Sequence, residues 1–295
     1  MHLEFLGLMR DAETAGPGVR LEYFTKGCIR GVINPCEGCF NESSWTFGGA
    51  KKTMTVEEVV NHALECAWNR QVTFCGGEPM LQAKAITEVV KRLKQCDPNF
   101  HVVMYTAYKL DTLLKYGLKF TWVPKYGQDM LEALLSYGTL TTIVDGEVES
   151  PPGYYAHVGI DIDDCLSAKS VEFILLTPQD VRELLTAVDI IVDGDYQFDK
   201  RLTTDQYMHK GWFIGSANQR VIDCEQTINV CNTEEGEMIY QTAEEFNAYC
   251  EEHQPCLTCT QSTKGKNVAG QYCSIQCKQK HRRYEERMKS FEQQV

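Results

Sequence analysis

Three cysteines near the N-terminus have a spacing that suits a metal-binding loop: Cys28, Cys36 and Cys39. Three thiolates can hold three irons of a [4Fe–4S] cluster and leave the fourth iron open to another ligand, which a four-cysteine cluster cannot do. One glycine precedes Cys28 and another separates Cys36 from Cys39, as a tight loop favours. Incidental buried thiols are the simpler alternative, and the segment downstream favours the cluster.

That segment is Gly76-Gly77-Glu78-Pro79, which directly follows a short apolar run. Glycines after a strand let the backbone approach a ligand closely, and Glu78 supplies an anion for an amine. Alone, such a segment more often indicates a turn. Beside an open iron, it predicts S-adenosylmethionine (SAM) held on the cluster and cleaved to a radical.

The elements that must position these residues alternate between strand and helix. Strands are predicted over 19–25, 72–75 and 101–106, and helices over 55–68 and 82–94, the first opened by a capping box at Thr55. Such alternation predicts an α/β fold with a mainly parallel sheet. Ligands bind at the C-terminal ends of such strands, where the cysteines, Gly76 to Glu78, Tyr105 and Thr106 all fall.

The middle of the chain carries weaker signals. A helix is predicted over 131–135, a strand over 139–144, a helix start at Thr177-Pro178 and a strand over 189–192. Ile-Val-Asp-Gly occurs after both strands, at 143–146 and 191–194. The simplest interpretation is two strands of one sheet with similar ends, and an internal duplication is the alternative.

Four C-terminal cysteines form two short pairs, Cys256 with Cys259 and Cys273 with Cys277, and a basic helix is predicted after Cys273. This pattern predicts a tetrahedral zinc site with four thiolates. An auxiliary iron–sulfur cluster on Cys250, Cys256 and Cys259 is the alternative. The site would hold together a short tail that cannot build its own core, or present a docking surface.

Composition limits the remaining possibilities. The chain has 295 residues, 14 cysteines and a net charge of −12, with an isoelectric point near 5.1. The charge makes nucleic acid an improbable partner. Neither a signal peptide nor an apolar run of membrane-spanning length is visible, so we expect no membrane association and a cytoplasmic, reducing location. We interpret the isolated Cys66, Cys75, Cys96 and Cys165 as buried apolar residues.

The chain resembles the radical SAM superfamily, and within it the activating enzymes of anaerobic (class III) ribonucleotide reductase. The spacing Cys-x7-Cys-x2-Cys departs from the family's usual Cys-x3-Cys-x2-Cys. The resemblance implies a partial (β/α) barrel over 1–240, with an atypical insert at about 110–188, followed by the zinc module at 241–295. It rests on the cysteine loop, Gly76 to Pro79 and the stretches 16–20, 39–45, 105–108, 192–194 and 215–223.

The resemblance also implies a function. A [4Fe–4S] cluster would be held by the three N-terminal cysteines, and SAM by Gly76, Gly77 and Glu78, with Phe40, Tyr105 and Thr106 beside it. Reductive cleavage of SAM would yield a 5′-deoxyadenosyl radical that abstracts the Cα hydrogen of a glycine in a partner reductase. The electron would come from a low-potential donor such as a flavodoxin.

Two other functions remain open at this point. A radical SAM enzyme could act on a small molecule or on another protein, with the segment 110–188 shaping its pocket. A non-catalytic zinc-binding interaction protein could keep a degenerate fold, although the intact Cys28, Cys36, Cys39 and Glu78 argue against it.

Overall fold

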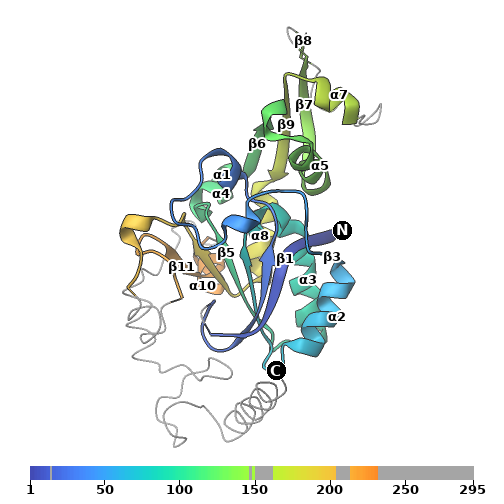
Figure 1. Ribbon diagram of the computed structural model, residues 1–295. Coiled ribbons are helices and arrows are strands. Elements are labelled where there is room, and N and C mark those ends of the chain that lie inside the picture. The colour runs from blue at the N-terminus through green and yellow to red at the C-terminus, as the bar shows by residue number, and fades with distance from the viewer. Residues whose placement is uncertain (14, 146–147, 150–161, 204–212, 232–295) are drawn as a thin grey trace, which may run out of the picture.

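A seven-stranded mixed sheet forms the centre of the molecule (Figure 1). The computed structural model describes residues 1–13, 15–145, 148–149, 162–203 and 213–231. Strands β2, β4, β5 and β10 pair in parallel, and β1, β3 and β11 add antiparallel edges. The predicted α/β fold with a mainly parallel sheet is thereby confirmed. The order is β11 (Arg220–Asp223), β10 (Ile190–Asp193), β5 (His101–Thr106), β4 (Gln71–Gly76), β2 (Arg20–Thr25), β1 (His2–Ala12) and β3 (Lys52–Thr55).

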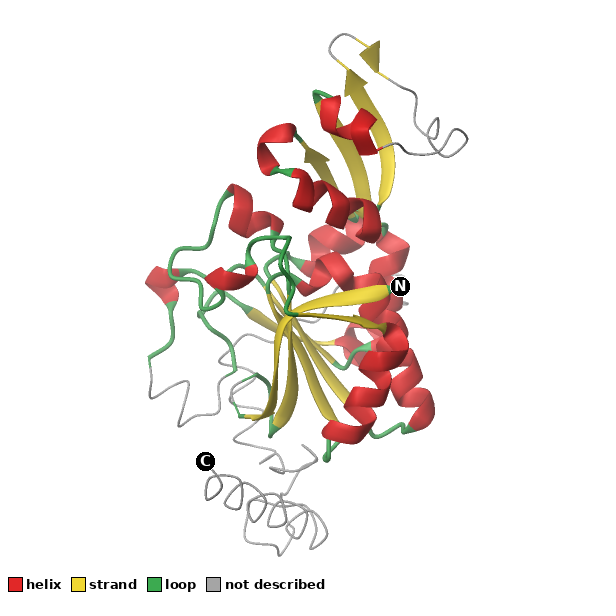
Figure 2. Ribbon diagram, turned by 45° about the vertical axis from the view of Figure 1, so that its right-hand side comes forward, coloured by secondary structure: helices red, strands yellow, loops and turns green. Residues whose placement is uncertain are grey.

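Helices pack on one face of this sheet, and loops lie on the other side (Figure 2). The predicted capping box at Thr55 is present, and Thr177 opens its helix with a second one. In α3 the buried Ile86, Val89, Val90 and Leu93 repeat with helical period, so one stripe faces the sheet. The layer comprises α2 (Val56–Cys66), α3 (Ala83–Cys96), α4 (Leu110–Tyr116), α8 (Pro178–Ala187) and α10 (Cys224–Cys231).

The segment expected to be an insert contains a second, four-stranded antiparallel sheet, which stands beyond the main sheet in Figure 1. Its order is β6 (Leu118–Trp122), β9 (Ser170–Leu176), β7 (Thr139–Asp145) and β8 (Val148–Glu149), with α5 (Gln128–Tyr137) and α7 (Ile162–Ser167) beside it. The two Ile-Val-Asp-Gly strands, β7 and β10, therefore belong to different sheets. Interpreting them as two strands of one sheet was wrong, because a four-residue similarity of strand ends carries no information on which sheet a strand joins.

Short helices complete the described chain: α1 (Ile29–Ile33), η1 (Glu42–Ser44), η2 (Pro79–Gln82), η3 (Pro124–Tyr126) and η4 (Phe198–Lys200). Among the described residues, no helix is long and apolar enough to cross a membrane. The expected zinc module, with Cys256, Cys259, Cys273 and Cys277, lies outside the described residues.

Candidate active site

The cysteine loop and the Gly-Gly-Glu segment lie side by side because β2 and β4 are parallel neighbours. Beyond the strand ends the pairing continues through two hydrogen bonds. Gly77 N donates to Thr25 O at 2.9 Å, and Glu78 N donates to Gly27 O at 2.9 Å. A Cβ on Gly77 would come within 2.4 Å of Gly27 O, so only glycine allows this approach. The two motifs therefore form one structural unit.

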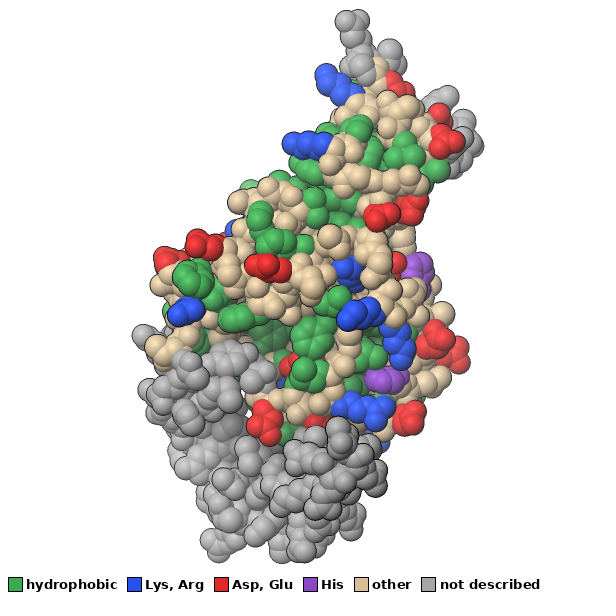
Figure 3. All heavy atoms as spheres, in the orientation of Figure 1, with side chains coloured by type: hydrophobic (Ala, Val, Ile, Leu, Met, Phe, Trp, Pro, Cys, Tyr) green, Lys and Arg blue, Asp and Glu red, His purple; other side chains and the backbone are tan. Residues whose placement is uncertain are grey.

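One cavity of about 320 Å³ adjoins this unit. All three predicted cluster cysteines line it, together with Gly76, Gly77, Phe40, Tyr105 and Thr106. In Figure 3, hydrophobic side chains gather near the middle of the face that is shown. The volume lies within the range of small-molecule and cofactor sites, about 300 to 1,000 Å³. The fold thus collects on one cavity eight of the residues predicted from the sequence.

Each of the three cysteine sulfurs accepts a hydrogen bond from a nitrogen. Cys28 Sγ accepts from Gly31 N at 3.3 Å, Cys36 Sγ from Arg30 Nε at 3.3 Å, and Cys39 Sγ from Asn41 N at 3.4 Å. Such donors stabilise a thiolate and tune an iron–sulfur cluster. Burial raises the pKa of the Cys28 thiol to about 12, so its thiolate needs a bound cation to persist.

The donor chemistry of the cysteine loop is that of an iron–sulfur cluster loop. In the part of the chain that the structure describes, no three His, Cys, Asp or Glu side chains converge as the ligands of one metal ion would. A cluster instead spreads its cysteines over different irons. Three free thiols around one cavity, each with a nitrogen donor, fit a [4Fe–4S] cluster.

Glu78 has a different environment from the one expected of a ligand for an amine. Its side chain is buried, and its two oxygens accept from Met80 N and Ala107 N, each at 2.9 Å. It also caps η2 and contacts Thr106. Burial raises the pKa of Glu78 to about 7, and these donors partly offset that rise. Glu78 thus ties the Gly-Gly turn to the end of β5, and direct contact with SAM stays a prediction.

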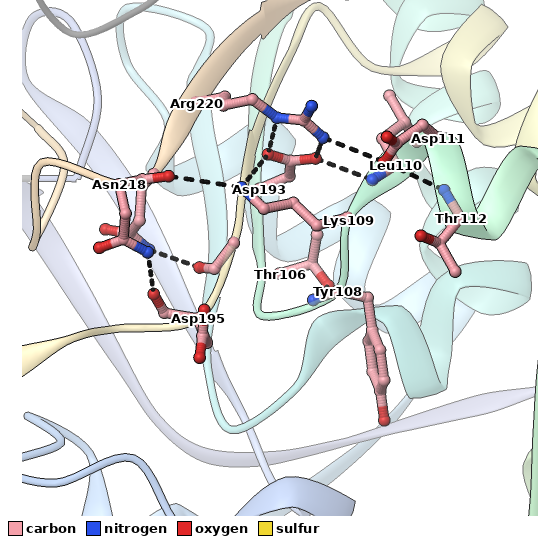
Figure 4. A network of polar contacts seen from close by, with 12 residues as sticks. Thr106, Tyr108, Lys109, Leu110, Asp111, Thr112, Asp193, Asp195, Asn218 and Arg220 are labelled. Atoms are coloured by element: carbon pink, nitrogen blue, oxygen red, sulfur yellow. Dashed lines mark hydrogen bonds and ion pairs between the residues drawn. The ribbon is translucent and has the colours of Figure 1, made fainter.

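The stretch 215–223, which carried much of the family resemblance, supports the loop after β10. Gln219 Oε1 accepts from Gly215 N at 2.7 Å, and Gln219 Nε2 donates to Gly194 O at 2.9 Å. Asn218 Nδ2 donates to Asp195 O at 2.8 Å (Figure 4). Gly194, Gly215 and Gln219 line the cavity. These residues had no role assigned from the sequence, and the structure gives them a supporting one.

A buried carboxylate anchors the same loop. Asp193 is fully buried at the end of β10 and accepts from Arg220 through both oxygens, with Arg220 Nε at 2.8 Å from Oδ1. Leu110 N also donates to it at 2.7 Å, and Lys109 Nζ lies 3.6 Å away (Figure 4). The network joins β10, β11 and the start of α4, directly before Gly194, which lines the cavity.

A further ion pair joins the loop after β10 to the cysteine loop. Arg30, the donor to Cys36, also pairs with Asp195 at 2.6 Å. Phe40 is 72% exposed at the cavity rim and packs on Tyr196, with ring centroids 4.9 Å apart. No sequence motif indicates Arg30, Asp195 or Tyr196, because these residues are brought to the site only by tertiary contacts.

Three other cavity residues were missed or misjudged. Cys75, expected to be a buried apolar residue, lines the cavity beside Gly76. Trp45 lines it near Cys28, and Glu22 lines it from the middle of β2. Alternation along β2 places Glu22 on the face of Phe24, which could have been read from the sequence. Among the other isolated cysteines, Cys165 is buried as expected, Cys66 is half-buried and Cys96 is exposed, contrary to expectation.

Arg20 is a structural residue and not a cavity residue. It is buried, and its guanidinium donates to Thr73, Gln71, Pro17 O, Val72 O and His101 O at 2.6–3.0 Å. The partners are neutral, and burial lowers the pKa of Arg20 to about 9. The guanidinium therefore joins β2, β4 and β5 below the cavity.

Known proteins match this part of the chain. Residues 14–149 match a family described as a 4Fe-4S single cluster domain. An anaerobic ribonucleoside-triphosphate reductase-activating protein of Haemophilus influenzae is 31% identical over 105 residues, which are 34% of this chain and 65% of the relative. The match therefore spans just under two thirds of that relative.

Two further relatives are also named as activating proteins or enzymes. The protein of the same description from Vibrio cholerae is 29% identical over 137 residues, which are 45% of this chain and 76% of the relative. A pyruvate formate-lyase-activating enzyme of Staphylococcus epidermidis is 36% identical over 84 residues, which are 27% of this chain and 32% of the relative.

Proposed function

We propose that this chain is a radical SAM activating enzyme that installs a glycyl radical on an anaerobic ribonucleotide reductase, as its similarity to a 4Fe-4S single cluster domain and to reductase-activating proteins supports. The observation that carries the proposal is the single cavity shared by three thiols and the Gly-Gly turn. The relatives from Haemophilus influenzae and Vibrio cholerae, named for such a reductase, support the choice of partner.

Different residues of the cavity would bind the cluster and SAM. Cys28, Cys36 and Cys39 would hold a [4Fe–4S] cluster, and Gly76 and Gly77 would let SAM approach the backbone. When bound and reduced, the cluster supplies one electron that splits SAM into methionine and a 5′-deoxyadenosyl radical, which takes the hydrogen atom from a glycine Cα. The apolar parts of the wall, with Phe24 and Tyr105, would shield that radical from water.

Loss of one cluster cysteine tests the proposal. The Cys36→Ala variant, reconstituted anaerobically with iron and sulfide, should lose SAM cleavage to 5′-deoxyadenosine and the glycyl doublet in the EPR spectrum of the reductase. Cys96→Ala is the matched control, because Cys96 is exposed and lies outside the cavity. SAM cleavage by Cys36→Ala at the wild-type rate, or an iron-free wild-type protein, would refute the proposal.

Several finer assignments belong to the same proposal. The main domain would be a partial (β/α) barrel of radical SAM type over 1–240, with an insert at about 110–188. A low-potential donor such as a flavodoxin would supply the electron. Direct binding of SAM by Glu78, Phe40, Tyr105 and Thr106 is also proposed, and for all but Glu78 their place on the cavity supports it.

We further propose that Cys256, Cys259, Cys273 and Cys277 bind one zinc ion in a C-terminal module over 241–295. Two short cysteine pairs in one segment support it. Metal analysis should find one zinc per chain beyond the iron of the N-terminal cluster, and Cys259→Ser should lose the zinc alone. Additional iron in place of zinc would show an auxiliary cluster instead.

A further inference from the structure

The cavity is lined both by the cysteine loop and by Glu22 on β2. Glu22 pairs with Thr73 in the β2–β4 ladder, and Gly76 pairs with Thr25 three residues later. Three residues of strand span about 10 Å. Glu22 and Gly76 both line the cavity, which therefore reaches about that far from the predicted SAM site into the sheet.

Glu22 is a buried acid with an unused acceptor. Its exposed fraction is 3%, and no group of the described residues forms a hydrogen bond with its Oε1. Burial raises the pKa of Glu22 to about 7. An unpartnered buried carboxyl oxygen costs free energy, so a donor that enters the cavity would gain a strong hydrogen bond there.

The neighbouring cation does not satisfy this oxygen. Arg20 is two residues away on the same face of β2. Its positive charge offsets only part of the rise in the pKa of Glu22 that burial causes. The guanidinium hydrogen bonds of Arg20 run to Thr73, Gln71 and main-chain carbonyls instead. Among the described residues, Oε1 of Glu22 thus remains an acceptor for a group from outside the chain.

The proposed reaction defines what such a group must be. A glycine that gives up a Cα hydrogen has no side chain, so the polar groups next to that carbon are its own and its neighbour's main-chain amides. The walls around Glu22 are small or apolar, with Ala15, Met9 and Phe24. A narrow, extended backbone segment suits this end of the cavity.

We infer that Glu22 binds the partner protein's glycine segment by accepting a hydrogen bond from a main-chain N–H. This inference rests on the proposed function and extends it to the substrate side of the same cavity. It assigns the cysteine end to the cofactors and the Glu22 end to the protein substrate.

Two substitutions at one position test it. Glu22→Met keeps the size but removes the acceptor, whereas Glu22→Gln keeps a neutral oxygen that still accepts. With the anaerobic ribonucleotide reductase of the same organism as the probe, Glu22→Met should raise the KM for the reductase about tenfold or more. Glu22→Gln should stay within about threefold of the wild type, because an amide oxygen still accepts an N–H.

The readouts distinguish the possible outcomes. The effect of Glu22→Met on the KM for the reductase should exceed its effect on the KM for SAM by about tenfold. Glu172→Met, on the exposed surface of β9 outside the cavity, is the matched control and should change neither. Thermal melting of each variant monitors folding, and Glu22→Gln is informative even if Glu22→Met melts early.

Three results would overturn the inference. If Glu22→Met raised the KM for SAM more than the KM for the reductase, the Glu22 carboxyl would contact SAM instead of the reductase. An equal rise of the KM for the reductase in Glu22→Gln and Glu22→Met would mean that Glu22 binds a cationic side chain of the reductase and not a main-chain N–H. A wild-type reductase KM in Glu22→Met would mean that no donor binds there. If the wild type cleaves SAM but gives no glycyl radical on the reductase, the proposed function itself fails, and the inference with it.

Discussion

The two faces of the central sheet are formed by alternate residues of the same strands, but one face packs against helices and the other lines the cavity. On the helix side, Phe74, Met104 and Ile191 are fully buried in one apolar core. On the cavity side, the neighbouring Thr73, Cys75 and Tyr105 carry polar groups. Since successive side chains point to opposite faces, one strand can serve both layers. The comparison shows that the helix face provides stability and the cavity face leaves room for the site.

The sharpest test of this comparison uses adjacent residues. Phe74→Ala should lower the free energy of unfolding by about 3–5 kcal/mol, because the ring is fully buried and stacks on Tyr23 with centroids 5.2 Å apart. Cys75→Ala, one residue later on the cavity face, should cost less than about 1 kcal/mol. Denaturant unfolding measures both, and equal losses would contradict the division between the faces.

A buried charge is the exception on the helix side. Asp193 follows Val192 on β10 and holds Arg220 and Leu110 N. Asp193→Asn should cost roughly 3 kcal/mol in the free energy of unfolding, because it leaves the partly buried Arg220 without its main partner. Glu88→Gln removes the exposed pair with Arg92 and should cost under about 0.5 kcal/mol. Similar losses in both variants would show that burial of the pair is unimportant.

Gly77, directly after β4, lets the Gly-Gly turn approach the cysteine loop closely. Gly77→Ala should destabilise the protein by about 1–3 kcal/mol and weaken SAM binding, because its Cβ would strike the main-chain oxygen of Gly27. Gly7→Ala on β1 is the control, since its Cβ would meet no atom within 4 Å. Melting temperature and SAM titration measure the two effects. Unchanged SAM affinity in Gly77→Ala would separate the turn from the cofactor.

The smallest expected effect concerns the acid on the cavity face. A carboxyl whose pKa is raised by folding, as that of Glu22 is to about 7, binds more protons when folded between pH 4.5 and 7. The free energy of unfolding should therefore fall as the pH rises through that window and level off above it. Glu22→Gln removes this pH-dependent contribution. The free energy of unfolding of the variant, relative to that of the wild type, should therefore rise by about 2 kcal/mol from pH 5 to pH 7.5. A pH-independent difference would show that the carboxyl is solvated.

Much of the main domain was predictable from local signals. The predicted strands 72–75 and 101–106 and the helix opened by Thr55 appear within two residues of their observed bounds. These elements combine a strong hydrophobic pattern with a capping or turn signal, so propensity and tertiary packing agree. The antiparallel edge strands β1 and β3 and the sheet of β6 to β9 were not predicted in full, because their pairing joins residues far apart in sequence.

Residue types and their spacing in the sequence predict which residues carry the chemistry. Cys28, Cys36, Cys39 and the Gly-Gly turn could be identified from residue type and spacing, because thiolates and glycines have few other uses in such a pattern. How these residues are supported becomes visible only in the fold. Glu78 accepts a hydrogen bond from Ala107 N, Arg30 lies between Cys36 and Asp195, and Glu22 lines the cavity from β2. The physical reason is that burial, hydrogen-bond satisfaction and cavity walls are set by strands and loops that meet across the fold and leave no local trace in the chain.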